Sequence, residues 1–286
     1  MANLKEIRNR ITSVSSTMQI TSAMKMVSAA KLKKAQDAIT AMRPYAEKLT
    51  ELLQNLSATL DGDSAGKFAE QRPVNKILLV AITSNRGLSG AFNANIVKET
   101  KRLTQTIYPG KQVDFVTIGK KGNDIIRKMN TVITNNNEIY DNLNFENVSL
   151  IAEELMQLFA DGQYDKIELV YNQFKNAATQ IVITEQFLPI IPMKSDNVKS
   201  VDYIFEPSKE QIVEELIPRS LKTQLYKAIR DSYASEHGAR MTAMHKATDN
   251  ATELRNQLKL TYNKARQAAI TNEILEIVGG AEALNG

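Results

Sequence analysis

The chain has 286 residues, of which 43% are hydrophobic and 24% are charged, a composition typical of folded rather than disordered proteins. It contains no Cys and only two His. These counts exclude disulfides, thiolate metal sites, cysteine nucleophiles and a histidine-rich metal centre. No apolar run is long enough to span a bilayer, and the charged first ten residues do not form a secretory signal. We therefore expect a protein of a reducing cytosolic space with no direct membrane span.

Charge is distributed unevenly along the chain, whose net charge is +4. Residues 1–60 carry nine Lys/Arg and four Asp/Glu, and residues 219–286 carry ten and seven. The middle, 61–218, carries 17 basic and 21 acidic residues. Basic ends predict an acidic partner, either nucleic acid or acidic protein loops.

Both ends of the chain predict long helices, because Gly and Pro are nearly absent from 1–60 and 219–278 while good helix formers fill both stretches. At the N-terminus, apolar residues at alternating spacings of three and four form a seam through Leu4, Ile7, Ile11, Val14 and Met18, which then drifts towards Met24, Val27 and Ala30. The C-terminal stretch has a matching series, and Gly279 and Gly280 are expected to end it. The members of this series are Leu254, Leu258, Ala265, Ala269, Ile270, Ile274 and Ile277.

Length decides how these helices are buried. Sixty helical residues extend roughly 90 Å, whereas a compact globule of this chain length has a radius of gyration of about 19 Å. The two helices are therefore expected to protrude and to bury their seams against each other as an antiparallel coiled coil.

The middle of the chain predicts an α/β layer fold with a mainly parallel sheet. A helix is expected to start at Lys209 and to break at Pro218, and polar connections at 61–72 and 193–200 flank this middle part. The expected strands are Lys76–Thr83, Gln112–Ile118, Thr131–Ile139 and a hairpin of Lys166–Asn172 with Thr179–Phe187. The expected helices are Ala91–Tyr108, Gly122–Met129 and Ser149–Ala160.

The first strand-to-helix turn, Thr83–Asn93, is the one candidate ligand loop. Its small residues could cradle an anion on free backbone N–H groups, but it matches neither the dinucleotide fingerprint nor the P-loop. A tight turn or a protein contact through an exposed Arg86 is favoured over anion binding.

No other constellation predicts chemistry. His237 and His245 are eight residues apart, about two helical turns, which is too far for one metal ion. Glu153 and Glu154 are adjacent on a helix and diverge, so paired-carboxylate catalysis is not expected. Residues 7–36 hold six Lys/Arg and no acid, and we leave open a solvated face, a contact with acidic protein and, least favoured, nucleic acid.

The two ends resemble a known family. Asn3–Gln36 (NLKEIRNRITSVSSTMQITSAMKMVSAAKLKKAQ), the turn Ser84–Gly90 (SNRGLSG) and Ala234–Val278 are similar to the γ subunits of F-type ATP synthases. The resemblance implies a shaft of the two end helices (1–60 paired with 208–286) and a Rossmann-like α/β domain at 73–207. It implies a proton-driven central-stalk rotor with no catalytic site, cofactor or metal of its own, which also regulates ATPase activity and proton flow.

The resemblance also implies partners and contact residues. The partners would be a ring of α and β subunits around the shaft, the ε subunit and the ring of c subunits, at the cytoplasmic face of a bacterial inner membrane. Residues that match contacts with β are Met24, Arg86, Ser89, Arg266, Gln267 and Thr271. Since the chain starts at the first helix and lacks Cys, we expect a bacterial protein without the redox switch of photosynthetic relatives.

Two other functions remain as alternatives. One is a Rossmann-type enzyme that uses the SNRGLSG loop and dimerises through coiled-coil arms. The other is a free-standing basic coiled coil that binds nucleic acid, which would show a steep salt dependence.

Overall fold

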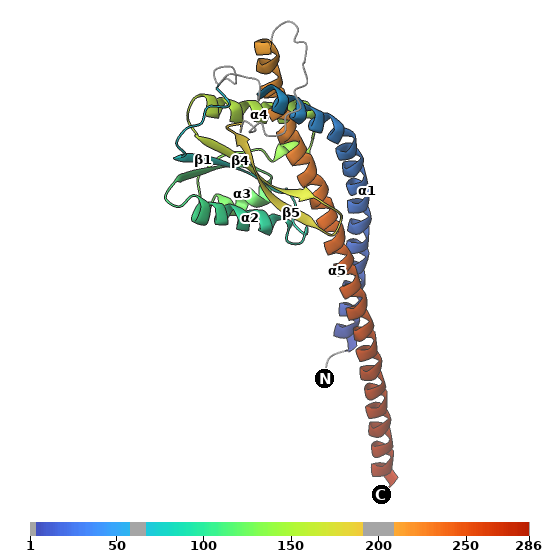
Figure 1. Cartoon of the computed structure of the whole chain (residues 1–286). Coiled ribbons are helices and arrows are strands. Elements are labelled where there is room, and N and C mark those ends of the chain that lie inside the picture. Colours follow the sequence, from blue (N-terminus) through green and yellow to red (C-terminus); the bar gives the residue numbers. More distant parts are fainter. Residues whose placement is uncertain (1–3, 58–66, 191–208, 286) are drawn as a thin grey trace. The chain divides into compact units, whose positions relative to one another are not determined.

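A computed structural model describes residues 4–57, 67–190 and 209–285 of the chain (Figure 1). The predicted polar loop 193–200 and part of the linker 61–72 lie outside these residues. Tertiary contacts divide the chain into two compact units, Met1–Ser28 with Met241–Gly286, and Ala29–Arg240. We call them the helical-pair unit and the α/β unit.

The helical-pair unit contains the start of α1 (Leu4–Ser57) and the end of α5 (Lys209–Asn285). The Thr21 and Thr248 hydroxyls share a 2.8 Å hydrogen bond, and the Thr252 hydroxyl donates to the Met18 sulfur at 3.3 Å. Because one residue number falls as its partner rises, the two helices run antiparallel, as expected.

The seam of this pair differs from the predicted one after Met18. Thr21 and Ser28 are buried, whereas Val27 is 57% exposed and Ala30 is exposed. Each buried hydroxyl lies close to a carbonyl of its own helix, Met18 O at 3.1 Å and Met24 O at 2.8 Å. A small side chain with a satisfied hydroxyl can therefore occupy a close helix contact without a desolvation penalty.

The far end of α5 also departs from the prediction. Ile270, Ile274 and Ile277 are 49%, 54% and 66% exposed. The register of the two hydrogen bonds places Leu4, the first described residue of α1, opposite about Ala265. The remainder of α5 therefore extends past the described part of α1, and its apolar residues have no seam to enter.

Two predicted helix ends are wrong, because α5 continues through Pro218 and through Gly279 and Gly280. A proline inside a helix removes one hydrogen bond, but Ile217 and Leu221 on either side are buried in a core that holds the helix in place. Each glycine costs about 1 kcal/mol of helix propensity and does not forbid a helix.

The α/β unit is built on one five-stranded sheet in the order β3-β2-β1-β4-β5. The first four strands are parallel, and β4 and β5 form the expected antiparallel hairpin. The strands are β1 (Lys76–Ile82), β2 (Gln112–Ile118), β3 (Val132–Asn135), β4 (Lys166–Phe174) and β5 (Gln180–Leu188). The fold class is therefore the predicted one.

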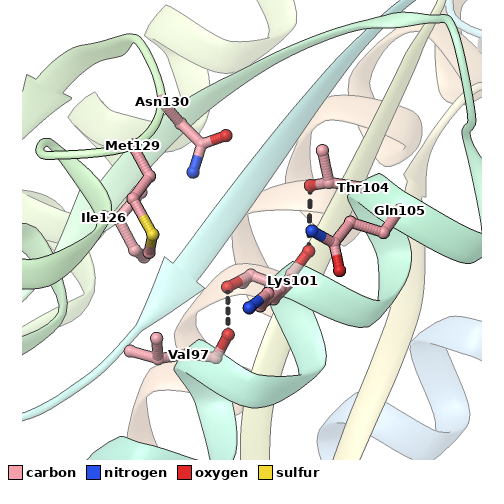
Figure 2. Close-up of a pocket in the computed structure, with 8 residues that line it drawn as sticks. Val97, Lys101, Thr104, Gln105, Ile126, Met129 and Asn130 are labelled. Carbon is pink, nitrogen blue, oxygen red and sulfur yellow. Dashed lines mark hydrogen bonds between the residues drawn. The ribbon is translucent and has the colours of Figure 1, made fainter.

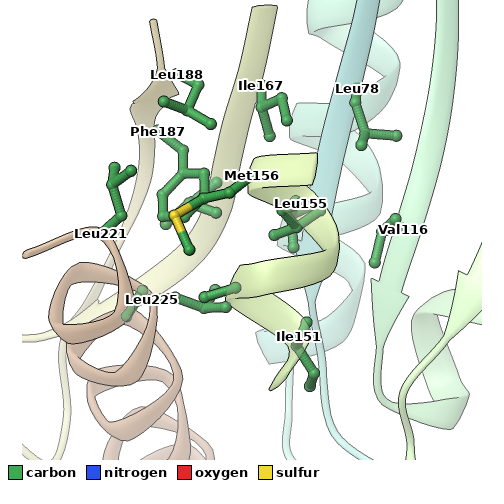
Figure 3. Close-up of a cluster of buried hydrophobic side chains, with 14 of the residues drawn as sticks. Leu78, Val116, Ile151, Leu155, Met156, Ile167, Phe187, Leu188, Leu221 and Leu225 are labelled. Carbon is green, nitrogen blue, oxygen red and sulfur yellow. The ribbon is translucent and has the colours of Figure 1, made fainter. Parts of the chain in front are cut away.

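Helices cover both faces of this sheet. On one face, α4 (Phe145–Ala160) and the start of α5 pack through buried residues that include Leu155, Met156 and Leu225 (Figure 3). On the other face, Ile96 of α2 (Phe92–Arg102) and Ile126 of α3 (Lys120–Ile126) contact the alternate residues of β1. The strands are buried on both faces, which explains the continuous apolar run at 77–82.

Several element boundaries differ from the sequence prediction. The helix expected over Ala91–Tyr108 is α2 followed by a π-helical turn, η1 (Leu103–Ile107). The third strand stops at Asn135, and a short 3₁₀ helix, η2 (Glu138–Tyr140), follows. Helix α4 starts four residues early because the Asn144 side chain accepts a hydrogen bond from the Asn147 N–H at 2.8 Å and caps it. Over the described ranges, none of the helices combines the length and apolarity needed to cross a bilayer.

Candidate functional site

The turn after β1 lies at the point of the sheet where a doubly wound fold usually binds a ligand. From β1 the chain moves outward to β2 and β3, and later returns to the other side of β1 as β4. Ligands in open α/β sheets bind at the carboxyl ends of the two strands that flank such a reversal. Here those are β1, which leads into Thr83–Ala91, and β4, which leads into the hairpin turn.

Helix α5 occupies this position. The Ser235 hydroxyl donates to the Asn172 carbonyl of β4 at 2.9 Å, and Arg240 Nη2 donates to the carbonyls of Arg86 and Gly87 at 3.2 and 3.3 Å. Between them, Gly238 lies so close to the hairpin turn that an added Cβ would be 3.1 Å from the Ala177 carbonyl oxygen. The crevice that would take a nucleotide is therefore filled by the protein's own helix.

The turn is held in shape by its own side chains. Asn93 accepts from the Ser84 N–H at 2.9 Å and donates to the hydroxyls of Ser84 and Ser89 at 2.8 and 3.3 Å. Leu88 and Gly90 adopt the left-handed conformation, with φ of 62° and 60°. The turn presents carbonyl groups to Arg240, which is the opposite polarity to a phosphate cradle built from N–H groups. This geometry favours a protein contact over anion binding.

A buried ion pair anchors the contact on the α5 side. Arg240 Nη1 lies 2.6 Å from Glu236 Oε1, and both residues are 7% exposed. Burial raises the pKa of the Glu236 carboxyl, while Arg240, Lys31 and Arg86 oppose that rise. Because the guanidinium also serves two turn carbonyls, removing it would leave a buried carboxylate and two carbonyls without their donor.

His237 sits beside this pair as a neutral group. Burial, with the charges of Arg240 and Lys31, lowers the pKa of its imidazole to about 3. Its ring packs edge-on against Tyr233, with centroids 4.5 Å apart, and Tyr233 stacks on Tyr140. The Tyr140 hydroxyl donates to the Thr83 carbonyl at 2.7 Å, so a chain of rings connects α5 to the base of the turn.

The residues matched to β-subunit contacts fall into both units. Arg86 is exposed at the tip of the turn, as expected, but Ser89 is only 1% exposed and supports the turn from inside. Met24 is half-buried on α1. Arg266, Gln267 and Thr271 form one exposed group on α5, and the Thr271 hydroxyl donates to the Gln267 carbonyl at 2.9 Å.

Among the described residues, no group of three or more His, Asp or Glu side chains is placed to hold a metal ion. His237 is buried in the α/β unit, whereas His245 is exposed in the helical-pair unit, 3.5 Å from Asp249.

Sequence reasoning missed the site residues on α5. Ser235, Glu236 and Arg240 lie in the stretch that carries the family resemblance, yet no role was assigned to any of them. Their polar side chains resemble those of a solvated helix face, and the four-residue spacing of Glu236 and Arg240 signals only that these two share a side of the helix. Their burial depends on contacts with β4 and the turn, more than 60 residues away in sequence.

Comparisons with known proteins agree over the whole chain. The family model for ATP synthase matches residues 3–284. ATP synthase gamma chains of Flavobacterium johnsoniae and Christiangramia forsetii are 77% and 71% identical, with complete coverage of both chains in each pair. A chain in the central stalk and c-ring structure of the Tetrahymena thermophila mitochondrial ATP synthase is 27% identical with a TM-score of 0.62, covering 80% of this chain and 99% of that one. A chain of the Euglena gracilis mitochondrial ATP synthase shares the fold at 22% identity, with a TM-score of 0.73 and coverage of 98% and 94%. The chain therefore belongs to the ATP synthase gamma chain family.

Proposed function

We propose that this chain, a central-stalk rotor subunit of an F-type ATP synthase, couples proton-driven rotation to ATP synthesis without a catalytic site of its own, and that it regulates ATPase activity and proton flow. The two end helices, 1–60 and 208–286, act as the shaft, and the α/β domain at 73–207 is the globular domain that carries this shaft. Catalysis would then reside in the β subunits, whose conformations the shaft drives in turn.

The observation that carries this proposal is the uncovered end of α5. Beyond about Ala265 the helix has no described partner, and its apolar residues are roughly half exposed or more. A helix end of this kind needs a cover in water. A surrounding ring of α and β subunits would provide one that allows the helix to turn.

Polar contacts with β complete the proposed shaft. A rotor must meet three similar faces in succession, so each contact has to be weak and exchangeable. Exposed Arg266, Gln267 and Thr271 suit that role on α5, and acidic loops of β are the expected match for the basic ends. Met24 and the turn with Arg86 and Ser89 are proposed as further β contacts, with buried Ser89 acting by shaping the turn.

The remaining partners are proposed from the family. They are the ε subunit and the c ring, which would place the chain at the cytoplasmic face of a bacterial inner membrane. The crevice at the carboxyl ends of β1 and β4 is where the alternative function, a Rossmann-type enzyme, would bind its nucleotide. Because α5 side chains occupy that crevice, nucleotide binding there would require α5 to leave.

The proposal is tested in the assembled complex. A tagged chain is purified from membranes, and α, β, ε and c subunits are expected to accompany it, while the isolated chain should show no ATPase activity. Leu258→Pro, which breaks the helix inside the paired region, should abolish ATP-driven proton pumping, whereas Leu258→Met should preserve it. Absence of all four partners, or full pumping by Leu258→Pro, would contradict the proposal.

A further inference from the structure

The face of the α/β unit formed by α2, η1 and α3 is strongly basic. Residues 98–128 contain eight Lys/Arg and three Asp/Glu. Asp114 is buried on the opposite face of the sheet beside the Tyr164 hydroxyl, and Glu99 pairs with Arg102 at 2.6 Å. Only half-buried Asp124 is left to balance the other cations. Within the described part of the chain, none of the remaining cations on this face forms an ion pair with a carboxylate. The exposed cations are Lys98, Lys101, Lys111, Lys120, Arg127 and Lys128.

A small groove on this face has an apolar part formed by Val97, Ile126 and Met129. Val97 and Lys101 of α2 face Ile126, the last residue of α3, and Met129 just beyond it (Figure 2). The rest of the lining is polar and consists of Thr100, Thr104, Gln105 and Asn130. Met129 is 59% exposed. Ile107 of η1 and Ile125 of α3 are 48% and 42% exposed, so the same elements present further apolar side chains at the surface.

The size and lining of the groove identify the class of ligand. Its volume is about 130 Å³, well below the roughly 300–1,000 Å³ of a small-molecule or cofactor pocket. A space of this size fits one or two apolar side chains. Exposed Met and Ile surrounded by cations is the pattern of a protein interface with an apolar centre and a charged rim. Nucleic-acid platforms instead use aromatic stacking, and no aromatic side chain lines this groove.

We propose that the α2–α3 face is a docking surface for an acidic protein segment that inserts a large apolar side chain between Val97 and Met129 and places carboxylates against Lys101, Arg127 and Lys128. The opposite face of the sheet could not serve the same partner, because α4 exposes Glu146, Glu153 and Glu154 there. The unit is therefore polarised, and only one face attracts an acidic partner. The inference rests on the proposed function only in placing the chain in a multisubunit complex.

The test is photo-crosslinking in the complex purified from membranes. The photoreactive residue p-benzoylphenylalanine replaces Met129, and in a matched control it replaces Leu150, a 65% exposed residue of α4. Irradiation of the Met129 variant should yield a protein adduct whose crosslinked peptide has more Asp/Glu than Lys/Arg, and the Leu150 variant should not yield that adduct. Adding Lys101→Glu and Lys128→Glu, or raising salt to about 0.5 M, should reduce the adduct at least about five-fold, since exposed ion pairs are screened.

Other outcomes overturn the inference. They are no adduct at Met129, an adduct only with lipid or nucleic acid, or a protein adduct that charge reversal leaves unchanged. Co-purification of the α and β subunits is recorded in the same sample. If these subunits are absent, the proposed function fails. If they are present and the acidic adduct is missing, the docking surface alone fails.

Discussion

Replacing Arg240 with methionine should destabilise the α/β unit more than any other single change of an arginine on α5. Methionine keeps the apolar stem of the side chain but removes the guanidinium from Glu236, which lies 2.6 Å away and is 7% exposed. Breaking a buried ion pair from one side costs about 3–5 kcal/mol, because the remaining charge stays buried without its partner. The two bonds to the turn carbonyls are long, at 3.2 and 3.3 Å, and add about 0.5 kcal/mol each.

The pH dependence of this loss separates electrostatics from packing. Without Arg240, the pKa of the Glu236 carboxyl, already raised by burial, should rise further. A carboxyl whose pKa is raised in the folded protein destabilises the fold at any pH above its pKa in the unfolded chain, which is about 4.5. This destabilisation decreases as the pH falls towards that unfolded pKa, because the carboxyl becomes protonated in the folded protein. The pKa of His237, lowered partly by Arg240, should recover, which acts in the same direction. The destabilisation should therefore be smaller at pH 5 than at pH 8.

The assay is urea unfolding of the full chain, followed by circular dichroism at both pH values. Arg219→Met is the matched control, since Arg219 is an exposed arginine of α5 that lies 5.9 Å from the Tyr45 ring and should cost less than about 1 kcal/mol. The double variant Glu236→Gln/Arg240→Met should recover about 2 kcal/mol relative to the sum of the single changes. A loss at Arg240 no larger than at Arg219, or an equal loss at both pH values, would refute the reasoning.

Two further changes test the packing under the turn. Gly119→Ala should cost about 3 kcal/mol or more in urea unfolding, because Gly119 has φ of +105° and an added Cβ would overlap the Thr83 carbonyl oxygen. Gly110→Ala, at φ +74° with nothing within 4 Å of the added atom, should cost only about 1 kcal/mol, and similar losses at the two glycines would contradict the predicted clash. His237→Gln should flatten the loss of stability on acidification. The wild-type imidazole, with its pKa lowered to about 3, stabilises the fold above pH ~6.5 and should have lost about 2 kcal/mol by pH 5. Glu236, whose raised pKa acts in the opposite sense, is common to both proteins, so an unchanged slope would show that His237 is not held neutral by burial.

The parts of the fold that sequence could predict are those set by periodicity over many residues. Alternating spacings of three and four identified the pairing face of α1 from Leu4 to Met18, and the apolar run at 77–82 identified the central strand. Both patterns come from burial that repeats along one element, so they can be read without knowing the neighbours.

The predictions failed where a single contact overrides a local preference. Pro218 and Gly279 disfavour a helix locally, but α5 continues through both. Thr21 and Ser28 look like surface residues, but their hydroxyls are satisfied by their own helix and the pair buries them. The basic α2–α3 face escaped notice because its charge was averaged with the acidic residues of the rest of the middle segment.

The candidate site could be located by sequence but not understood from it. The turn Ser84–Gly90 was recognisable, and exposed Arg86 was anticipated. The Glu236–Arg240 pair on α5, which contacts this turn, could not be anticipated. These two residues become a buried pair only because α5, distant in sequence, lies across the carboxyl ends of β1 and β4. No local pattern distinguishes such residues from a solvated helix face.

The contacts of α5 change along its length, from buried contacts in the α/β unit to exposed side chains near its C-terminal end. From Ile217 to Ile229 its buried residues, apart from Thr223, are apolar and belong to the core of the α/β unit. From Asp231 to Arg240 they are largely polar, and two of them, Ser235 and Arg240, donate to backbone carbonyls of β4 and of the turn. These two contacts fix the angle of the helix about its axis, because a hydrogen bond is directional whereas apolar packing is not. Beyond about Ala265 its side chains are exposed. In α5 the directional contacts therefore lie within the α/β unit, whereas the side chains beyond about Ala265 make no such contact with the described part of α1.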